Sequence, residues 1–137
     1  MKVLVIGANG QIGTKVVDKL LDSKNTPVAM VRKEADIPKF KEKGAEVILA
    51  DLEEEIDHAF DGIDAVVFTA GSGAHTGKDK TDLVDRKGAI KAIDKAAEYG
   101  ADRFIMVSAF GADFDPSEWS DSMAHYYSAK SDADDHL

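Results

Sequence analysis

Three glycines at intervals of three residues, Gly7, Gly10 and Gly13, stand between an apolar run and an amphipathic one near the start of the chain. The run before them, Lys2–Ile6, predicts a strand buried on both faces, and apolar residues at helical spacing follow them. A simple strand–turn–helix would need only one glycine, and glycine weakens both elements. Three of them indicate a site where one glycine makes the turn, one admits a pyrophosphate and one lets the helix pack on the strand.

Two basic residues occupy the position at which a dinucleotide site of this kind distinguishes NADP from NAD. Arg32 and Lys33 follow the predicted strand Pro27–Val31, about 20 residues beyond the glycines. A site that prefers NAD places an acidic side chain there to bind the ribose 2′-hydroxyl, whereas arginine binds a 2′-phosphate with two hydrogen bonds. The sequence therefore predicts NADP as cofactor, and the neighbouring Glu34 keeps NAD as the less favoured alternative.

Alternating strands and helices must position these residues. Five strands separated by short helices predict an α/β fold, a doubly wound parallel sheet with strand order 3-2-1-4-5. The long helix Thr81–Tyr99 is expected to turn Leu83, Ile90, Ile93 and Ala97 inward. The expected strands are Lys2–Ile6, Pro27–Val31, Glu46–Leu49, Asp64–Thr69 and Arg103–Val107, and the other expected helices are the one after Gly10, Asp36–Lys43, Leu52–Phe60 and a last one near Met123–Leu137.

The segment Gly7-Ala8-Asn9-Gly10-Gln11-Ile12-Gly13 resembles the GATGxxG motif of the extended and atypical short-chain dehydrogenases/reductases. The resemblance covers the whole chain and is nearest to the NmrA-like, NAD-dependent epimerase/dehydratase-like and biliverdin-IX-beta reductase-like groups. It implies an NAD(P)-binding Rossmann domain, with an adenine contact after the third strand and a ribose contact after the fourth. The implied cofactor residues are Gly7, Asn9, Gly10, Gln11, Ile12, Gly13, Arg32, Lys33, Asp51, Leu52, Thr69, Ala70 and Gly71.

The same resemblance implies catalytic roles for four further residues. Ser108 matches the family's catalytic serine, and Tyr126 and Lys130 match its Tyr-x-x-x-Lys pair. Lys130 lies one helical turn beyond Tyr126, so its ammonium is expected to favour the phenolate. Asp85 stands where the family usually has an asparagine. Tyr127, three residues before Lys130, stays open as the alternative tyrosine.

These residues imply hydride transfer between NADP(H) and a small carbonyl, alcohol, quinone or flavin-type substrate, or an epimerase/dehydratase-like reaction on a sugar. The alternative is a non-catalytic NADP-binding redox sensor of the NmrA type. Family members continue past the Tyr/Lys helix. We therefore expect residues 1–137 to form one domain, the N-terminal portion of a longer protein, with a surface that favours homo-oligomers.

Composition excludes several other classes. A net charge of −9 and a pI near 4.8 argue against nucleic acid as a partner. The absence of cysteine rules out disulfides and thiolate metal sites, and the four histidines show no metal-ligand spacing, so no metal is expected. No apolar run is long enough for a membrane span and no signal peptide is recognisable, which favours a cytoplasmic protein. The glycine-rich segment 71–79 lacks P-loop spacing, but its His75, like His125 beside Tyr126, is a candidate for lining the site.

Overall fold

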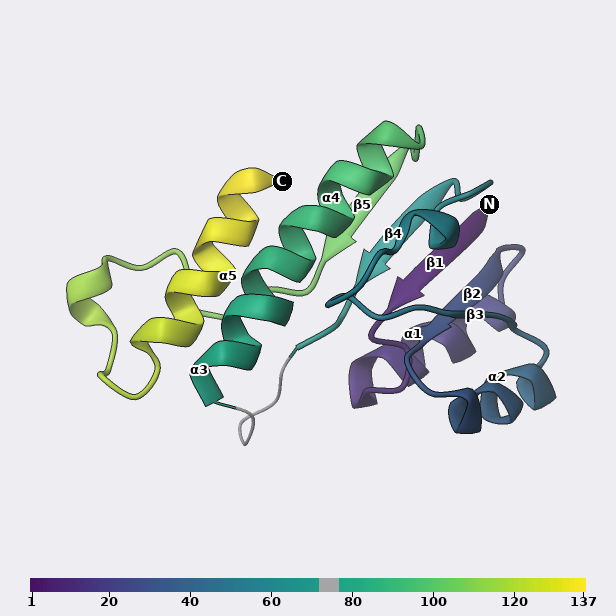
Figure 1. Ribbon diagram of the computed structural model, residues 1–137, viewed down its shortest axis with the longest axis horizontal. Coiled ribbons are helices and arrows are strands. Elements are labelled where there is room, and N and C mark those ends of the chain that lie inside the picture. Colours follow the sequence, from purple (N-terminus) through teal and green to yellow (C-terminus); the bar gives the residue numbers. More distant parts are fainter. Residues whose placement is uncertain (72–76) are drawn as a thin grey trace.

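The computed structural model describes residues 1–71 and 77–137, which form one parallel sheet with helices on both faces (Figure 1). The strands lie in the order β3-β2-β1-β4-β5, and every neighbouring pair is parallel. The predicted doubly wound sheet and its strand order are confirmed. The strands are β1 (Lys2–Ile6), β2 (Thr26–Val31), β3 (Glu46–Leu49), β4 (Ala65–Phe68) and β5 (Arg103–Met106).

Two apolar clusters lie on opposite faces of this sheet. In β1, Leu4 and Ile6 belong to one cluster and Val5 to the other, and β2 alternates in the same way. Strands buried on both faces therefore appear in the sequence as continuous apolar runs. Helices α1 (Gln11–Leu21) and α2 (Ile37–Lys43) pack on one face, and α4 (Ala89–Glu98) and α5 (Ala124–His136) pack on the other.

The segment between β3 and β4 corrects one expectation. The predicted helix Leu52–Phe60 is absent apart from a single 3₁₀ turn, η2 (Asp57–Ala59). The Asp51 carboxylate accepts a hydrogen bond from the backbone N–H of Glu53 at 2.9 Å, and the Glu55 carboxylate accepts one from the N–H of Asp57. Such local bonds compete with the helical ladder, and the resulting turns bury both Leu52 and Ile56.

The long helix after β4 also differs from its prediction. It begins earlier, with α3 (Gly77–Lys80), continues as the π-helical segment η3 (Thr81–Gly88), and only then becomes α4. A π-helix has more residues per turn, so it shifts the inward face. The exposed side chains include Leu83 and Ala97, Ile90 and Ile93 are half-buried, and the buried positions are Thr81, Asp85, Gly88, Ala89, Ala92 and Ala96.

Two short 3₁₀ turns, η1 (Glu34–Asp36) and η4 (Pro116–Glu118), complete the elements, and η4 lies in the segment that joins β5 to α5. Within residues 1–71 and 77–137, every helix is too short and too polar to cross a membrane.

Candidate nucleotide and active site

A cleft of about 470 Å³ opens at the carboxyl ends of the strands, where the chain order reverses between β1 and β4. This is the position at which open α/β sheets bind their ligands. Most of the residues predicted to hold the cofactor line it. They are Gly7, Asn9, Gly10, Arg32, Lys33, Asp51, Leu52, Thr69, Ala70 and Gly71.

The three glycines differ in what requires them. Gly7 has a positive φ of 82°, and a Cβ there would lie 2.5 Å from the backbone nitrogen of Ala70. A Cβ at Gly13 would lie 2.0 Å from the carbonyl oxygen of Gly7. Gly10 has an ordinary φ of −74°, and a Cβ there would meet only the Gly7 oxygen, at 3.3 Å. Chain packing therefore explains Gly7 and Gly13, whereas the bare surface of Gly10 faces the cleft at the N-terminus of α1, as a phosphate group requires.

Hydrogen bonds fix the loop that carries these glycines. The Thr69 hydroxyl donates to the carbonyl oxygens of Ile6 and Gly7, at 2.9 and 3.1 Å, and the Thr14 hydroxyl donates to the carbonyl of Ala8 at 2.9 Å. The hydroxyl of Thr69 thus braces the glycine turn, while the residue itself lines the cleft.

Lys39 is a contact of the glycine loop that the sequence did not predict. Its ammonium donates to the Asn9 side-chain oxygen at 2.7 Å, and both residues line a second hollow, together with Gly10, Gln11, Thr14 and Lys15. Gln11 therefore lies beside the main cleft, while Ile12 is half exposed and Gly13 is buried under the turn. The α2 helix places Lys39 beside the glycine loop, although Lys39 is 30 residues from Asn9 in the chain. No local pattern in the sequence predicts this contact.

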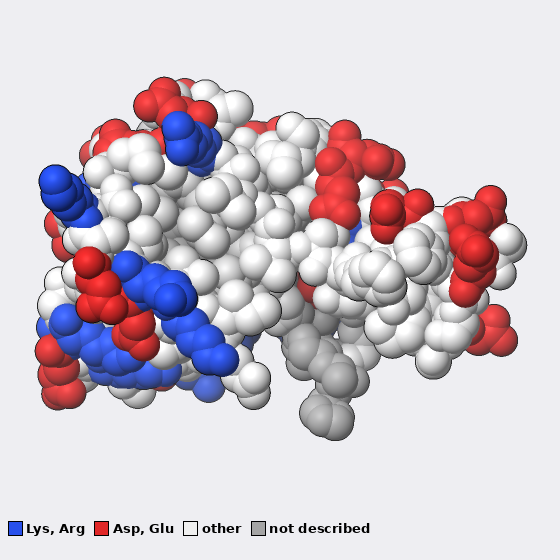
Figure 2. Space-filling view, turned by 180° about the vertical axis from the view of Figure 1, so that it is seen from behind, with Lys and Arg blue, Asp and Glu red and all other residues white. Residues whose placement is uncertain are grey.

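The adenosine end of the cleft carries charges of both signs. Arg32 and Lys33 line it, and so does Asp36, whereas Glu34, the predicted NAD-type alternative, is not among the lining residues. In Figure 2, Lys and Arg side chains gather over the end that holds β2, β3 and α2, whereas the end that holds α5 shows mainly Asp and Glu. Arg32 and Lys33 thus lie at the position expected for a 2′-phosphate, but Asp36 adds a carboxylate that a ribose hydroxyl would bind.

Three of the four predicted catalytic residues, Asp85, Tyr126 and Lys130, lie near one another beyond the end of the cleft that Gly71 lines. Asp85 is fully buried and Lys130 is 2% exposed, while Tyr126 is half-buried. A Cβ added to Gly71, which lines the cleft, would lie 3.4 Å from the Asp85 carboxylate, so Asp85 stands directly behind the cleft wall. The Lys130 ammonium lies 5.7 Å from the centre of the Phe68 ring at the end of β4.

Burial is the largest influence on the pKa values of Tyr126 and Lys130. Burial raises the pKa of the Tyr126 phenol, and the charge of Asp85 and the neighbouring Tyr127 raise it further. Burial lowers the pKa of Lys130, against the opposing influence of Asp85 and Asp134. The shift of the Tyr126 pKa is thus opposite to the expectation that the Lys130 ammonium favours the phenolate, because desolvation and the Asp85 charge both favour the neutral phenol.

Ser108 follows β5 and is held by Asp134, a residue that the sequence did not predict at the site. Its hydroxyl donates to the Asp134 carboxylate at 2.5 Å, and Asp134 lies one turn beyond Lys130 on α5. Asp134 was overlooked because only the packing of α5 against the end of β5 brings it to Ser108.

The two adjacent tyrosines face different surroundings. The Tyr127 ring lies 5.9 Å from the Trp119 ring, and its Cζ atom is 3.9 Å from a Cβ placed on Gly111, so it packs toward the segment before α5. Tyr126 instead is subject to the charge of Asp85. This difference favours Tyr126 as the partner of Lys130.

Of the two histidines that were candidates for lining the site, the structure describes His125. His125 Nε2 lies 3.4 Å from the Asp82 carboxylate and 3.3 Å from the carbonyl oxygen of Lys78. His75 lies outside the described residues. In the described part of the chain, no group of three or more His, Asp or Glu side chains is arranged to hold a metal ion.

Comparison with known proteins identifies the family. A family model described as NAD(P)H-binding matches residues 7–137, and the chain belongs to that family. This agrees with the resemblance to the extended and atypical short-chain dehydrogenases/reductases and with a nicotinamide cofactor.

The individual relatives are longer than this chain. It is 51% identical to an uncharacterized sugar epimerase, YhfK, from Bacillus subtilis, over 98% of this chain and 64% of that protein. A structure from Bacillus halodurans, provisionally assigned as an NAD-dependent epimerase/dehydratase, superposes with a TM-score of 0.95 at 51% identity and covers all of this chain and 64% of its own. The Lactococcus lactis oxidoreductase ylbE superposes with a TM-score of 0.82 at 27% identity, over 98% of this chain and 61% of its own. The chain thus spans somewhat less than two thirds of the length of these relatives.

Proposed function

We propose that this chain binds NADPH and supports hydride transfer between that cofactor and the carbonyl or alcohol carbon of a small substrate. The observation that carries the proposal is that the buried Asp85, directly behind Gly71 at the edge of the nucleotide cleft, acts through its charge on the half-buried Tyr126 and the buried Lys130. Buried titratable groups with perturbed pKa values beside a ligand cleft are typical of active sites.

The cofactor residues divide the dinucleotide between them. The glycine turn and the N-terminus of α1 would hold the pyrophosphate, and the bare surface of Gly10 gives it room. Arg32 and Lys33 would hold the 2′-phosphate, and Asp51 and Leu52 would contact the adenine. Thr69, Ala70 and Gly71 would lie beneath the nicotinamide-side ribose, which leaves the reacting ring at the Asp85 end of the cleft.

Proton transfer falls to Tyr126. When bound, the nicotinamide supplies or accepts the hydride. A tyrosine phenol is protonated at neutral pH, and burial favours that neutral form further in Tyr126, so this phenol can donate its proton to a substrate oxygen as negative charge develops there. Lys130 would hold the ribose hydroxyls or stabilise the phenolate after transfer. The charge of Asp85 acts on both Tyr126 and Lys130.

One observation favours a second function, an NADP-binding redox sensor without turnover. The Ser108 proton is directed to Asp134 and is therefore not available to a substrate oxygen. A site that lacks this donor would stabilise a developing oxyanion less strongly, while the nucleotide cleft would remain complete.

A reductase assay separates the two functions. We would titrate NADPH by fluorescence and then assay aldehydes, ketones, quinones and flavins with wild type and Tyr126→Phe. Turnover that is lost in Tyr126→Phe, with an unchanged Kd for NADPH, supports the enzyme. Turnover that survives the substitution removes Tyr126 as the acid, and tight NADPH binding without turnover on any substrate favours the sensor.

A further inference from the structure

The helix that carries Tyr126 and Lys130 is attached to the rest of the fold by a row of polar contacts that no catalytic role explains. On α5, this row consists of His125, Ser128, Asp132 and His136, spaced three, four and four residues apart and therefore on one helical face. Their partners are Asp82 and Arg86 of η3 and Asp94 of α4. We call these seven residues the polar ladder.

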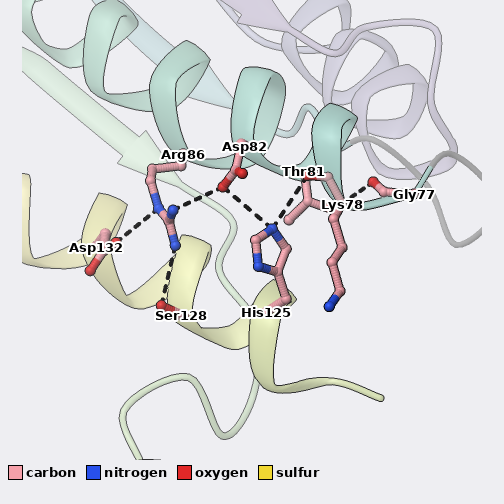
Figure 3. Close-up of polar contacts among 8 residues, drawn as sticks. All are labelled: Gly77, Lys78, Thr81, Asp82, Arg86, His125, Ser128 and Asp132. Carbon is pink, nitrogen blue, oxygen red and sulfur yellow. Dashed lines mark hydrogen bonds and ion pairs between the residues drawn. The ribbon is translucent and has the colours of Figure 1, made fainter. Parts of the chain in front are cut away.

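Arg86 is the centre of the polar ladder (Figure 3). One guanidinium nitrogen donates to the Asp82 carboxylate at 2.8 Å, and a second donates to the Ser128 hydroxyl at 3.2 Å. The third, Nε, forms an ion pair with Asp132 at 2.8 Å. The two hydrogen bonds fix Asp82 and Ser128 in direction as well as in distance, and the ion pair adds the attraction of Asp132.

The outer contacts extend this attachment along α5. Near the start of α5, His125 lies against the same Asp82 oxygen that Arg86 binds. Near its end, His136 Nε2 lies 2.7 Å from the Asp94 carboxylate. The helix is thus held at its start, middle and end against one continuous support, η3 followed by α4.

The polar ladder and the proposed active-site residues lie on different faces of α5. Tyr126, Lys130 and Asp134 recur every four residues and form a second stripe, and the buried Ala129 and Ala133 lie between the two stripes. Alanines permit close packing but offer little shape to resist rotation of the helix about its axis. The directional contacts of Arg86 supply that resistance.

The support of the polar ladder also carries Asp85. Asp82 and Arg86 flank Asp85 in the π-helical segment η3, whose altered turn directs Asp85 inward while its neighbours reach α5. Rotation of α5 would therefore move Tyr126 and Lys130 relative to Asp85, the charge that acts on both of them.

We propose that Arg86, through Asp82, Ser128 and Asp132, is a positioning residue that sets the rotation of α5 and so the placement of Tyr126 and Lys130 against Asp85. Its importance for turnover rests on the function proposed above, whereas its effect on the surroundings of Tyr126 does not.

The test compares Arg86→Gln with Arg86→Lys and with the control Arg103→Gln, whose arginine is exposed at the start of β5. Phenolate absorbance is recorded against pH for each variant with and without Tyr126→Phe, so that the difference isolates the Tyr126 titration. Arg86→Gln is expected to move the Tyr126 pKa down toward the ordinary value near 10, because the phenol loses burial and the Asp85 charge recedes. Arg86→Lys should restore part of the shift, and Arg103→Gln should leave it unchanged.

Turnover gives a second measurement. Arg86→Gln should lower kcat about 10- to 100-fold through misplacement of the proton donor, with the Kd for NADPH unchanged. If wild type shows no turnover, the proposed function fails but the Tyr126 titration still decides the positioning role. A folded Arg86→Gln protein with the wild-type Tyr126 pKa overturns the proposal. If that variant does not fold, Ser128→Ala and Asp132→Asn are titrated instead, and an unchanged Tyr126 pKa in both overturns it equally.

Discussion

Ser108 and Asp134 form a hydrogen bond of 2.5 Å in which the serine is the donor, so the Ser108 proton points toward α5. An ionised carboxylate can only accept, which leaves the serine oxygen able to accept a further bond but not to donate one. This arrangement assigns proton donation in the proposed reaction to Tyr126 alone.

Substitution of Ser108 should therefore reduce catalytic efficiency only slightly. Ser108→Ala removes at most one neutral hydrogen bond to substrate and is expected to lower kcat/KM about 2- to 10-fold. Tyr126→Phe removes the general acid and should lower it about 100-fold or more. Steady-state kinetics on both variants check this, with NADPH binding as the control for an intact cofactor site. Equal losses in the two variants would show that Ser108 is a donor in the reaction.

The glycine turn allows binding to be separated from folding. Gly10→Val should keep a folded protein, since the backbone there is ordinary, but its side chain would fill the expected phosphate position and abolish NADPH binding. Gly13→Ala is the contrasting variant and should unfold, because its Cβ would collide with the Gly7 carbonyl. Circular dichroism and fluorescence titration measure the two effects. Normal NADPH affinity in Gly10→Val would remove the pyrophosphate site from this turn.

Cofactor selectivity depends on the balance of charges at the adenosine end. Arg32→Ala should weaken NADPH about 10- to 100-fold and spare NADH, as expected for the loss of a charged hydrogen bond to the 2′-phosphate. Asp36→Asn should change selectivity in the opposite direction, because it removes a carboxylate from the same cleft. Lys41→Ala, an exposed cation of α2 outside the cleft lining, is the matched control. An equal loss of both nucleotides in Arg32→Ala would argue against the 2′-phosphate role.

The position of Asp85 beside Tyr126 predicts how the stability of the folded state changes at alkaline pH. Its charge raises the pKa of Tyr126, so Asp85→Asn should lower that pKa toward its ordinary value. The folded state holds the Tyr126 proton more tightly than the unfolded chain does. Its contribution to stability is therefore present below pH about 10 and is lost as the pH rises through the folded pKa. Asp85→Asn should move that loss to lower pH.

Phenolate absorbance and denaturation curves against alkaline pH measure this shift. Tyr126→Phe is the control, because it should abolish the difference between the wild-type and Asp85→Asn backgrounds. An unchanged alkaline transition in Asp85→Asn would show that the carboxylate does not influence Tyr126.

The edge strand β5 predicts self-association. Ile105 is 57% exposed on this strand, and Phe110 just beyond it is 89% exposed, while Val107 between them is partly exposed. Apolar side chains beside an open strand edge favour pairing of chains. Light scattering on the 137-residue chain should show association, and Ile105→Lys with Phe110→Ser should shift it toward the monomer. A stable monomer of the unmodified chain would contradict the prediction.

The sequence alone determined the order of the sheet and the place of the nucleotide cleft. Continuous apolar runs such as Val3–Ile6 can be satisfied only by burial on both faces, and strands that alternate with helices permit few topologies. Gly13 carries equally local information, since a Cβ there would meet the Gly7 carbonyl within the same turn, whereas a Cβ at Gly7 would meet the backbone of Ala70, just after β4. The lining of the cleft at Arg32 was predicted from its place after the second strand, and the lining at Asp51 and Gly71 was implied by the resemblance to the family.

The tertiary structure decided the rest, through local side-chain hydrogen bonds that periodicity does not reveal and through contacts between residues far apart in the chain. Side-chain bonds from Asp51 and Glu55 replaced the helix expected after β3 with turns, and the π-helical segment η3 turned Asp85 inward and Leu83 outward. Sequence periodicity does not predict that the Lys39 ammonium donates to Asn9 or that the Asp134 carboxylate accepts a hydrogen bond from the Ser108 hydroxyl. The titration of Tyr126 and Lys130 follows from how deeply they are buried, and burial exists only once α5 has packed against the sheet.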